Sequence, residues 1–368
     1  EYFINLIDCY GLHNYKILKR NLSLNDKYNK INDKSYICII SNIFIFLPIK
    51  ERIKLFLLNK QFNIKNNLKK EIFIKILTQK NISLSNRLII WEEILNISKL
   101  KSKYNYQEIK ESTFKRLSSG ELQKGTRPYN NNETITKDVK RTVFLVNKED
   151  NQKKLSNLLR CLNLLNPSIG YYQGISYIAA FFLQMLDFDE EKTFFYMLSL
   201  ETQTDYKNIF LNNLEMLNDN FKIFDKIIEI GLPDVSLHLN KLRVTSDFFA
   251  PSWFLTIFMC ISPLFDKKDI SKFCLLVFEK FILDGWESVF IAGFTALKYC
   301  YRELLKINET MIYTYLTNDF AEQDIFKNIL FDVAESDFIN NSEFINNILI
   351  SLVKNICCYE KKNKDEED

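Results

Sequence analysis

Apolar residues recur along much of this chain at intervals of three and four, the spacing of one buried face of an α-helix. The pattern is most regular in two stretches, Leu155–Leu165 and Phe210–Ile228. Gly231 and Pro233 follow the second stretch and are expected to end its helix, because glycine favours helix carboxyl ends and proline favours helix starts. Both stretches are therefore predicted to be amphipathic helices.

The same pattern predicts more helices and one long loop. Ser83 or Ser85 is expected to cap a helix that begins near Arg87. A polar stretch, Leu117–Thr134, holds two glycines and a proline and is predicted to be a loop of the kind that carries recognition contacts. The further predicted helices cover residues 69–79, 87–95, 104–115 and 190–200.

Composition supports an all-α fold. The 368 residues include only 8 glycines and 6 prolines, so the residues that punctuate turns and sheets are scarce. There are 31 phenylalanines and 18 tyrosines, which suit a helical core filled with large rings. We expect a multi-helix domain without a sheet of three or more strands.

Charge and cysteine content exclude several kinds of protein. A net charge of +3 gives no sign of nucleic-acid binding. Eight cysteines without a C-x-x-C pair, together with only 2 histidines, argue against a metal site and favour reduced thiols in a cytoplasmic protein. The uncharged runs Ile169–Leu186 and Phe248–Phe265 contain amides or prolines, so they are predicted to be core helices and not transmembrane segments.

The N-terminal part is expected to be a separate helical extension, residues 1–83. Within it, apolar residues on both sides of Leu47-Pro48, followed by Asn59-Lys60-Gln61-Phe62, resemble an F-box over residues 37–78. That resemblance implies docking to a ubiquitin-ligase adaptor. The alternative is a helical extension that packs against the main domain.

Two short segments carry candidate chemistry. One contains Asp138, Arg141 and Thr142, and the other is Ile169–Ala180, in which Gln173 stands between aromatic residues and Gly174. Taken alone, Asp138 and Arg141 are most simply a surface ion pair one helical turn apart. A lone glutamine in such a setting is most simply a helix cap or a core amide.

Together the two segments resemble the signature of the TBC domain, which activates Rab-type small GTPases. In that family an I-x-x-D-x-x-R element supplies an arginine finger, matched here by Arg141, and a Y-x-Q-G element supplies a glutamine finger, matched by Gln173. Asp138 and Thr142 are expected to support the first finger, and Tyr172 and Gly174 to shape the turn that presents the second. Tyr171 stands at a position that is often small or polar in the family.

Two more segments extend the resemblance, which then touches four segments in all. Arg87 and Trp91 match the first TBC motif and are expected to be structural. Asn96 stands where the family usually has glycine, a mild departure because asparagine also tolerates the left-handed conformation at a helix end. The later segment starts with Trp253-Phe254-Leu255, which matches the start of an apolar helix. Further along it, Phe278-Glu279 stands in the place of Trp-Asp, and Gly285 is expected to separate two helices. The TBC domain is therefore expected to cover residues 84–325, followed by C-terminal helices and a charged tail over 326–368.

The resemblance implies a mechanism. Arg141 would neutralise charge on the γ-phosphate and Gln173 would align the attacking water, both in trans. The partner is a Rab-family GTPase in its GTP-bound state, which brings its own GTP and Mg²⁺, so the chain needs no cofactor and is no hydrolase by itself. We expect a cytoplasmic protein that reaches endomembranes through its Rab partner and regulates vesicle trafficking.

A second hypothesis keeps the fold but not the activity. Some TBC domains act as scaffolds, so the chain could bind a Rab, or a ligase adaptor through residues 37–78, without stimulating hydrolysis. The presence of both finger residues favours the activating hypothesis.

Overall fold

A computed structural model describes residues 82–119, 127–142, 148–165, 171–261 and 272–316. The chain divides into two compact units between Ile82 and Ser83, and all the helices below belong to the second. The predicted extension over residues 1–83, its F-box-like part and the tail lie almost entirely outside the described residues. Those predictions stay predictions.

The described residues are helical and contain no strand, as the spacing of apolar residues predicted. The first half of the domain holds seven helices of the described chain: α6 (Leu84–Ile94), α7 (Ile97–Lys103), α8 (Tyr106–Ser118), α9 (Arg127–Arg141), α10 (Lys148–Leu165), α11 (Ile175–Met185) and α12 (Glu190–Gln203).

Shorter elements alternate with longer helices in the second half. They are η2 (Asp205–Phe210), η3 (Asn212–Leu214), α13 (Glu215–Gly231), α14 (Pro233–Lys241), α15 (Ser246–Phe249), α16 (Pro251–Thr256), η4 (Met259–Ile261), α17 (Lys272–Asp284), α18 (Glu287–Tyr299), α19 (Tyr301–Leu304) and α20 (Glu309–Thr314).

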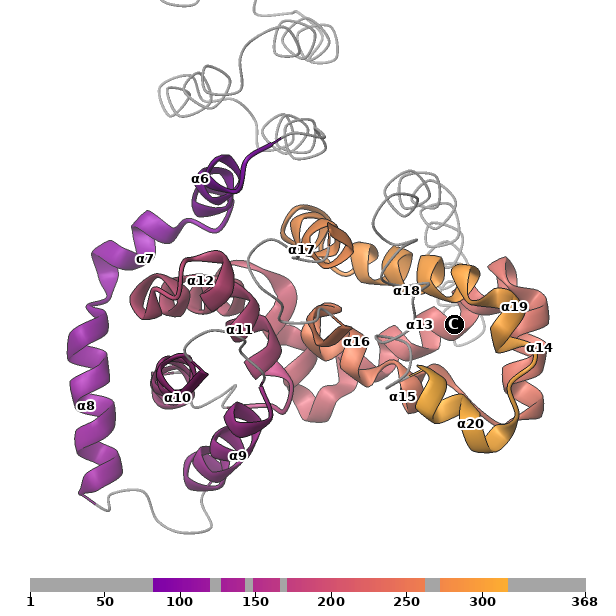
Figure 1. Ribbon diagram of the computed structural model, residues 1–368, viewed down its shortest axis with the longest axis horizontal. Helices are drawn as coiled ribbons and strands as arrows, with labels where there is room; N and C mark the ends of the chain where they lie inside the picture. Colours follow the sequence, from indigo (N-terminus) through magenta and orange to yellow (C-terminus); the bar gives the residue numbers. More distant parts are fainter. Residues whose placement is uncertain (1–81, 120–126, 143–147, 166–170, 262–271, 317–368) are drawn as a thin grey trace, which may run out of the picture. The chain divides into compact units, whose positions relative to one another are not determined.

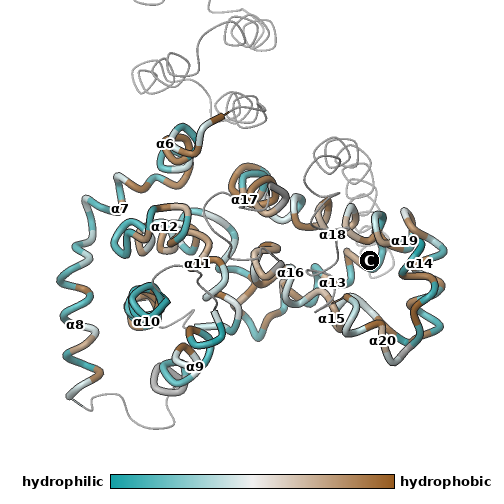
Figure 2. Tube along the Cα trace, in the orientation of Figure 1, coloured by the Kyte–Doolittle hydropathy of each residue, from teal (hydrophilic) through white to brown (hydrophobic). Residues whose placement is uncertain are grey.

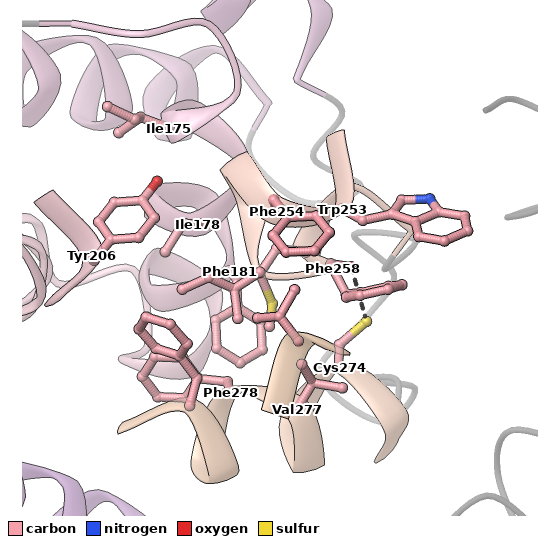
Figure 3. Close-up of a cluster of buried hydrophobic side chains, with 14 of the residues drawn as sticks. Ile175, Ile178, Phe181, Tyr206, Trp253, Phe254, Phe258, Cys274, Val277 and Phe278 are labelled. Atoms are coloured by element: carbon pink, nitrogen blue, oxygen red, sulfur yellow. Dashed lines mark hydrogen bonds between the residues drawn. The ribbon is translucent and has the colours of Figure 1, made fainter. Parts of the chain in front are cut away.

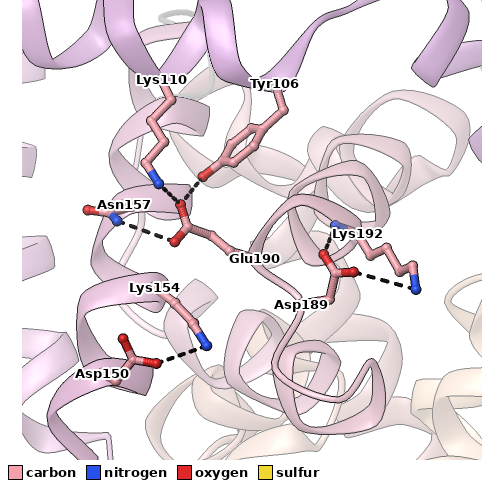
Figure 4. Close-up of polar contacts among 8 residues, drawn as sticks. All are labelled: Tyr106, Lys110, Asp150, Lys154, Asn157, Asp189, Glu190 and Lys192. Atoms are coloured by element: carbon pink, nitrogen blue, oxygen red, sulfur yellow. Dashed lines mark hydrogen bonds and ion pairs between the residues drawn. The ribbon is translucent and has the colours of Figure 1, made fainter.

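Helix α10 is the centre of the first half, with α8, α9, α11 and α12 packed around it (Figure 1). Much of α8, α9 and α10 is hydrophilic (Figure 2). Glu190 at the start of α12 joins three of these helices: its carboxylate accepts hydrogen bonds from Tyr106 Oη at 2.5 Å and Asn157 Nδ2 at 3.3 Å, and pairs with Lys110 Nζ at 2.6 Å (Figure 4). The shared carboxylate fixes α8 and α10 relative to α12.

An aromatic core continues from α11 into the second half of the domain. Ten of the eleven residues of α11, all except Tyr177, are buried. The ring of Phe181 packs against Phe278 of α17, with ring centroids 5.8 Å apart (Figure 3). The ring of Phe254 of α16 packs against Trp286, with centroids 6.2 Å apart. The uncharged run 169–186 therefore builds a core helix where it is described, and no helix in the described part of the chain has the length and hydropathy to cross a membrane.

Local signals in the sequence identified several helix ends correctly. Ser83 caps α6 by accepting a hydrogen bond from the Asn86 amide at 3.4 Å, and Asn96 adopts the left-handed conformation expected of it, with φ of 51°. Gly231 ends α13 and Pro233 begins α14. Gly285, with φ of 70°, separates α17 from α18.

The loop predicted over Leu117–Thr134 is wrong in its second part, because α9 begins at Arg127. Polar residues form a helix here because α10 satisfies their side chains. Asn131 Nδ2 donates to Asn163 Oδ1 at 2.9 Å, and Arg160 Nε donates to Asn132 Oδ1 at 2.6 Å. A sequence pattern cannot reveal such amide partners before the packing is known.

The helix predicted to begin at Phe210 begins five residues later, at Glu215. Asn212, Asn213 and Leu214 have positive φ values of 48°, 55° and 65°, which interrupt the helix. Phe210 itself lies in η2 and is still buried. The apolar spacing therefore predicted the burial of Phe210 correctly, but it wrongly predicted one continuous helix from that residue.

Candidate functional site

Arg141 is the last residue of α9 and its side chain is 60% exposed. Its Nη2 pairs with Oδ1 of Asp138, one turn earlier, whose side chain is only 3% exposed. This pairing raises the pKa of the Arg141 guanidinium. The result is a fixed positive charge at the surface, held from below by a buried carboxylate.

The carboxyl end of α9 is closed by side chains. Thr142 donates from Oγ1 to the Asp138 carbonyl at 3.0 Å. Gln152 of α10 donates from Nε2 to the carbonyls of Val139 at 3.0 Å and Thr142 at 3.1 Å. These bonds add to the backbone hydrogen bonds from the Thr142 amide to the Asp138 and Val139 carbonyls, so they hold the backbone that carries Arg141. Gln152 escaped the sequence analysis because it belongs to no motif.

Gln173 is exposed in the turn Tyr171–Gly174, which leads into α11. Gly174 has φ of +105°, a conformation that side chains disfavour. A Cβ at this position would lie 3.1 Å from Thr256 Cγ2 of α16. Glycine is therefore required both for the backbone conformation and for the close approach of the turn to α16.

Tyr172 fastens the same turn to η2. Its ring stacks on Phe210 with centroids 4.4 Å apart, and its hydroxyl donates to the Phe210 carbonyl at 2.7 Å. Tyr172 thus contacts the second half of the domain while the neighbouring Gln173 side chain stays exposed.

Tyr171 joins the two candidate segments directly. Its hydroxyl donates to Oδ2 of Asp138 at 2.7 Å, and α9 lies against α11. Burial, followed by this hydrogen bond, raises the pKa of the Tyr171 phenol, so it stays protonated as a donor. We expected a small or polar residue here, but the spacing of Y-x-Q-G itself assigns the motif's tyrosine to Tyr171 and its variable position to Tyr172.

Arg87 and Trp91 lie elsewhere, on α6. Arg87 Nη1 pairs with Oε2 of Glu279, and Trp91 Nε1 donates to Oε1 of the same carboxylate at 3.0 Å. Glu279 belongs to α17 and is buried. The two residues thus connect helices distant in sequence and are not part of the Arg141–Gln173 site.

The site therefore presents an exposed cation and an exposed carboxamide on adjoining segments with a buried support. Such a pair can bind an anionic group and orient a water molecule. Within the described ranges no group of three or more His, Cys, Asp or Glu side chains is arranged to hold a metal ion.

A family profile described as "Rab-GTPase-TBC domain" matches residues 85–306, more than half of the chain. The chain belongs to the Rab-GTPase-TBC domain family. The matched range includes every site residue described above. It also lies within the range 84–325 that the sequence motifs predicted for the TBC domain.

Several proteins similar to this chain are named as regulators of GTPases. This chain is 23% identical over 291 residues to the Rab GTPase-activating protein eat-17 of Caenorhabditis elegans, a match that covers 77% of this chain and 30% of the worm protein. It is 26% identical over 203 residues to the GTPase-activating protein GYP5 of Eremothecium gossypii, covering 55% of this chain and 22% of that protein. The chain thus spans less than a third of the length of these relatives.

Solved TBC domains share the fold of this one. The Chlamydomonas flagellar RabGAP TBC domain superposes with a TM-score of 0.54 at 16% identity, over 82% of this chain and 96% of that one. The Ypt/Rab-GAP domain of Gyp1p gives a TM-score of 0.53, also at 16% identity, over 83% and 98%. At this identity the likeness establishes the all-α TBC fold.

Proposed function

We propose that this TBC domain is a GTPase-activating protein for a Rab-type small GTPase in its GTP-bound state. Membership of the family and the names of its relatives support the activity. The activity regulates vesicle trafficking from the cytoplasmic face of an endomembrane, where the GTPase resides. GTP and Mg²⁺ belong to the GTPase, and this chain contributes side chains only.

In this proposal Arg141 and Gln173 act on the nucleotide in trans. Phosphoryl transfer to water builds negative charge on the oxygens around the γ-phosphate. The planar guanidinium of Arg141 can donate to two of those oxygens, which a lysine ammonium cannot match in geometry. The Gln173 carboxamide can both donate and accept, so it can align the attacking water.

The observation that carries the proposal is the hydrogen bond from Tyr171 to Asp138. It connects the residue two positions before Gln173 with the residue three positions before Arg141. The two exposed side chains are therefore supported by one buried contact, as expected of groups that must meet a single substrate.

A screen of the purified chain against a panel of GTP-loaded Rab proteins tests the proposal. We expect accelerated phosphate release with at least one Rab, and loss of that acceleration by about 10³-fold or more for Arg141→Ala and for Arg141→Lys. Lys226→Ala, which removes another exposed cation paired one turn away on α13, is the matched control and should behave as wild type.

A catalytically silent scaffold is the second candidate. The ion pair between Arg141 and Asp138 favours it, because an i, i+3 pair is also a common structural element of a helix end. The same screen separates the two. A scaffold would bind a Rab without accelerating hydrolysis, and Arg141→Ala would leave binding unchanged. Adaptor binding through residues 37–78 remains a prediction outside the described residues.

A further inference from the structure

The two carboxylate oxygens of Asp138 have different partners. Oδ1 accepts from Nη2 of Arg141, while Oδ2 accepts from the Tyr171 hydroxyl at 2.7 Å. Among the described residues, no hydrogen bond to Nε or Nη1 of Arg141 is formed. Asp138 therefore holds the arginine by one of its donor nitrogens and leaves the rest of the guanidinium fork available.

The arrangement is buried behind the arginine. Asp138 is 4% and Tyr171 5% exposed. A tyrosine that is buried in this way and hydrogen-bonded to Oδ2 has little freedom to leave that oxygen. Its preference for the neutral form keeps the hydroxyl proton in place.

The occupation of Oδ2 has a chemical consequence. Arginine and carboxylate groups frequently pair through two parallel hydrogen bonds, which engage two guanidinium nitrogens at once. An arginine bound in that way has fewer donors left for phosphate oxygens. The Tyr171 hydroxyl occupies one acceptor direction of Oδ2 and so competes with a second hydrogen bond from the arginine, which disfavours the two-bond pair.

We propose that Tyr171 is a positioning residue that restricts the Asp138–Arg141 pair to a single hydrogen bond and so keeps the guanidinium fork of Arg141 free for the γ-phosphate. This inference rests on the proposed function of Arg141. Tyr171 does not touch the nucleotide, and it acts through Asp138.

Tyr171→Phe is the informative variant, because it removes the hydroxyl and keeps the ring that fills the core. Without its competitor, Asp138 can close on Arg141 with both oxygens. Single-turnover hydrolysis by the responding Rab should slow by up to about 10²-fold, since a misplaced catalytic group can cost that much. The concentration of the TBC domain that gives half the maximal rate should stay within about twofold of wild type.

The matched control is Tyr196→Phe. Tyr196 is also fully buried, and its hydroxyl donates to the Leu88 carbonyl at 3.3 Å, away from the site. It should stimulate hydrolysis as wild type does. Thermal unfolding of both variants confirms that each is folded at the assay temperature.

A double mutant distinguishes positioning from a general structural role. In an Asp138→Asn background the strong two-bond ion pair cannot form, so adding Tyr171→Phe should lower the rate no further. If the two losses multiply, or if Tyr171→Phe alone hydrolyses as fast as wild type, the inference is wrong. If the wild-type chain activates no Rab, the proposed function is wrong, and this result is distinguishable from a failure of the inference about Tyr171.

Nuclear magnetic resonance of the arginine side chains tests the inference without any GTPase. The Arg141 guanidinium signals, assigned by their loss in Arg141→Lys, should shift in Tyr171→Phe and exchange more slowly with water, as expected of a second hydrogen bond to Asp138. They should be unchanged in Tyr196→Phe. Signals that are identical in wild type and Tyr171→Phe would overturn the inference whatever the outcome with Rab proteins.

Discussion

Single residues determine how the Gln173 turn is built, and Gly174 is the least replaceable of them. Its φ is +105°, and a Cβ added here would lie 3.1 Å from Thr256 Cγ2, so a side chain would be both strained and crowded. Tyr172 and Tyr171 fasten the two sides of the same turn by hydrogen bonds to η2 and to α9. The exposed Gln173 thus sits in a turn whose other three residues each have a defined contact.

Gly174→Ala should destabilise the fold and misplace Gln173. We expect a loss of more than ~1 kcal/mol in the free energy of unfolding, because alanine is strained at a positive φ. Gly285→Ala is the control: its φ is also positive, at +70°, but no atom lies within 4 Å of the added Cβ. Urea unfolding should show the larger loss for Gly174→Ala, and an equal loss in both would mean that crowding by Thr256 is unimportant.

At this scale the sequence predicted residues with local signals better than residues with distant partners. Ser83 and Asn96 were identified because a cap and a left-handed position depend on neighbouring residues alone. Tyr171 was misjudged, since its role depends on a carboxylate 33 positions earlier in the chain. The spacing of the motif already contained the correct assignment.

Between elements, two carboxylates make the connections: Glu190, which is partly buried, and Glu279, which is buried. Glu190 joins α8, α10 and α12, and Glu279 joins α6 to α17 through Arg87 and Trp91. Helices α10 and α13 were predictable because their apolar residues recur at intervals of three and four and so form one buried face on each helix. The Asn-rich start of α9 was not, because its amides bond to α10 and its sequence alone is typical of a loop.

Glu279→Ala tests the connection between α6 and α17. It leaves the Arg87 guanidinium, in a side chain only 15% exposed, without its carboxylate. Removing one partner of a buried pair typically costs about 3–5 kcal/mol, and urea unfolding should show a loss of that order. Glu229→Ala, which breaks an exposed pair with Lys226 on α13, should change stability by less than ~1 kcal/mol. Similar losses in both variants would contradict the account.

For the whole molecule, burial of thiols and phenols predicts weak stability at alkaline pH. Burial raises the pKa of Cys161 from 9.0 to about 11 and that of Cys300 to about 12, and it also raises the pKa of Tyr106 and Tyr171. As the pH rises, the unfolded chain loses these protons before the folded chain does. The free energy of unfolding therefore keeps its full value below pH 9 and falls as the pH rises above 9.

The thermal unfolding midpoint should therefore decline steadily between about pH 9 and 11. Cys161→Ala should reduce the slope, because one of the raised groups is then absent. A midpoint that is constant over this range would show that these groups do not resist ionisation in the folded state. The four described cysteines are free thiols, and the prediction that all 8 are free stays open to thiol titration.

The fold and family of the whole domain could be predicted from the sequence, since four motifs in order and a helical period extend over most of it. The roles proposed for Arg141 and Gln173 rest on the family resemblance, because an exposed arginine and an exposed glutamine are ordinary surface residues by themselves. Their common support through Tyr171 and Asp138 emerges only when α9 and α11 are packed together.

The central claim is that Gln173 supplies a glutamine in trans, and a Rab protein whose own catalytic glutamine is replaced by alanine tests it most directly. Single-turnover phosphate release from this Rab should still be accelerated by the wild-type TBC domain, and Gln173→Ala should abolish the acceleration while Gln152→Ala retains more of it. If the altered Rab does not respond to the wild-type domain although the normal Rab does, the GTPase provides its own glutamine and the mechanism proposed for Gln173 is wrong.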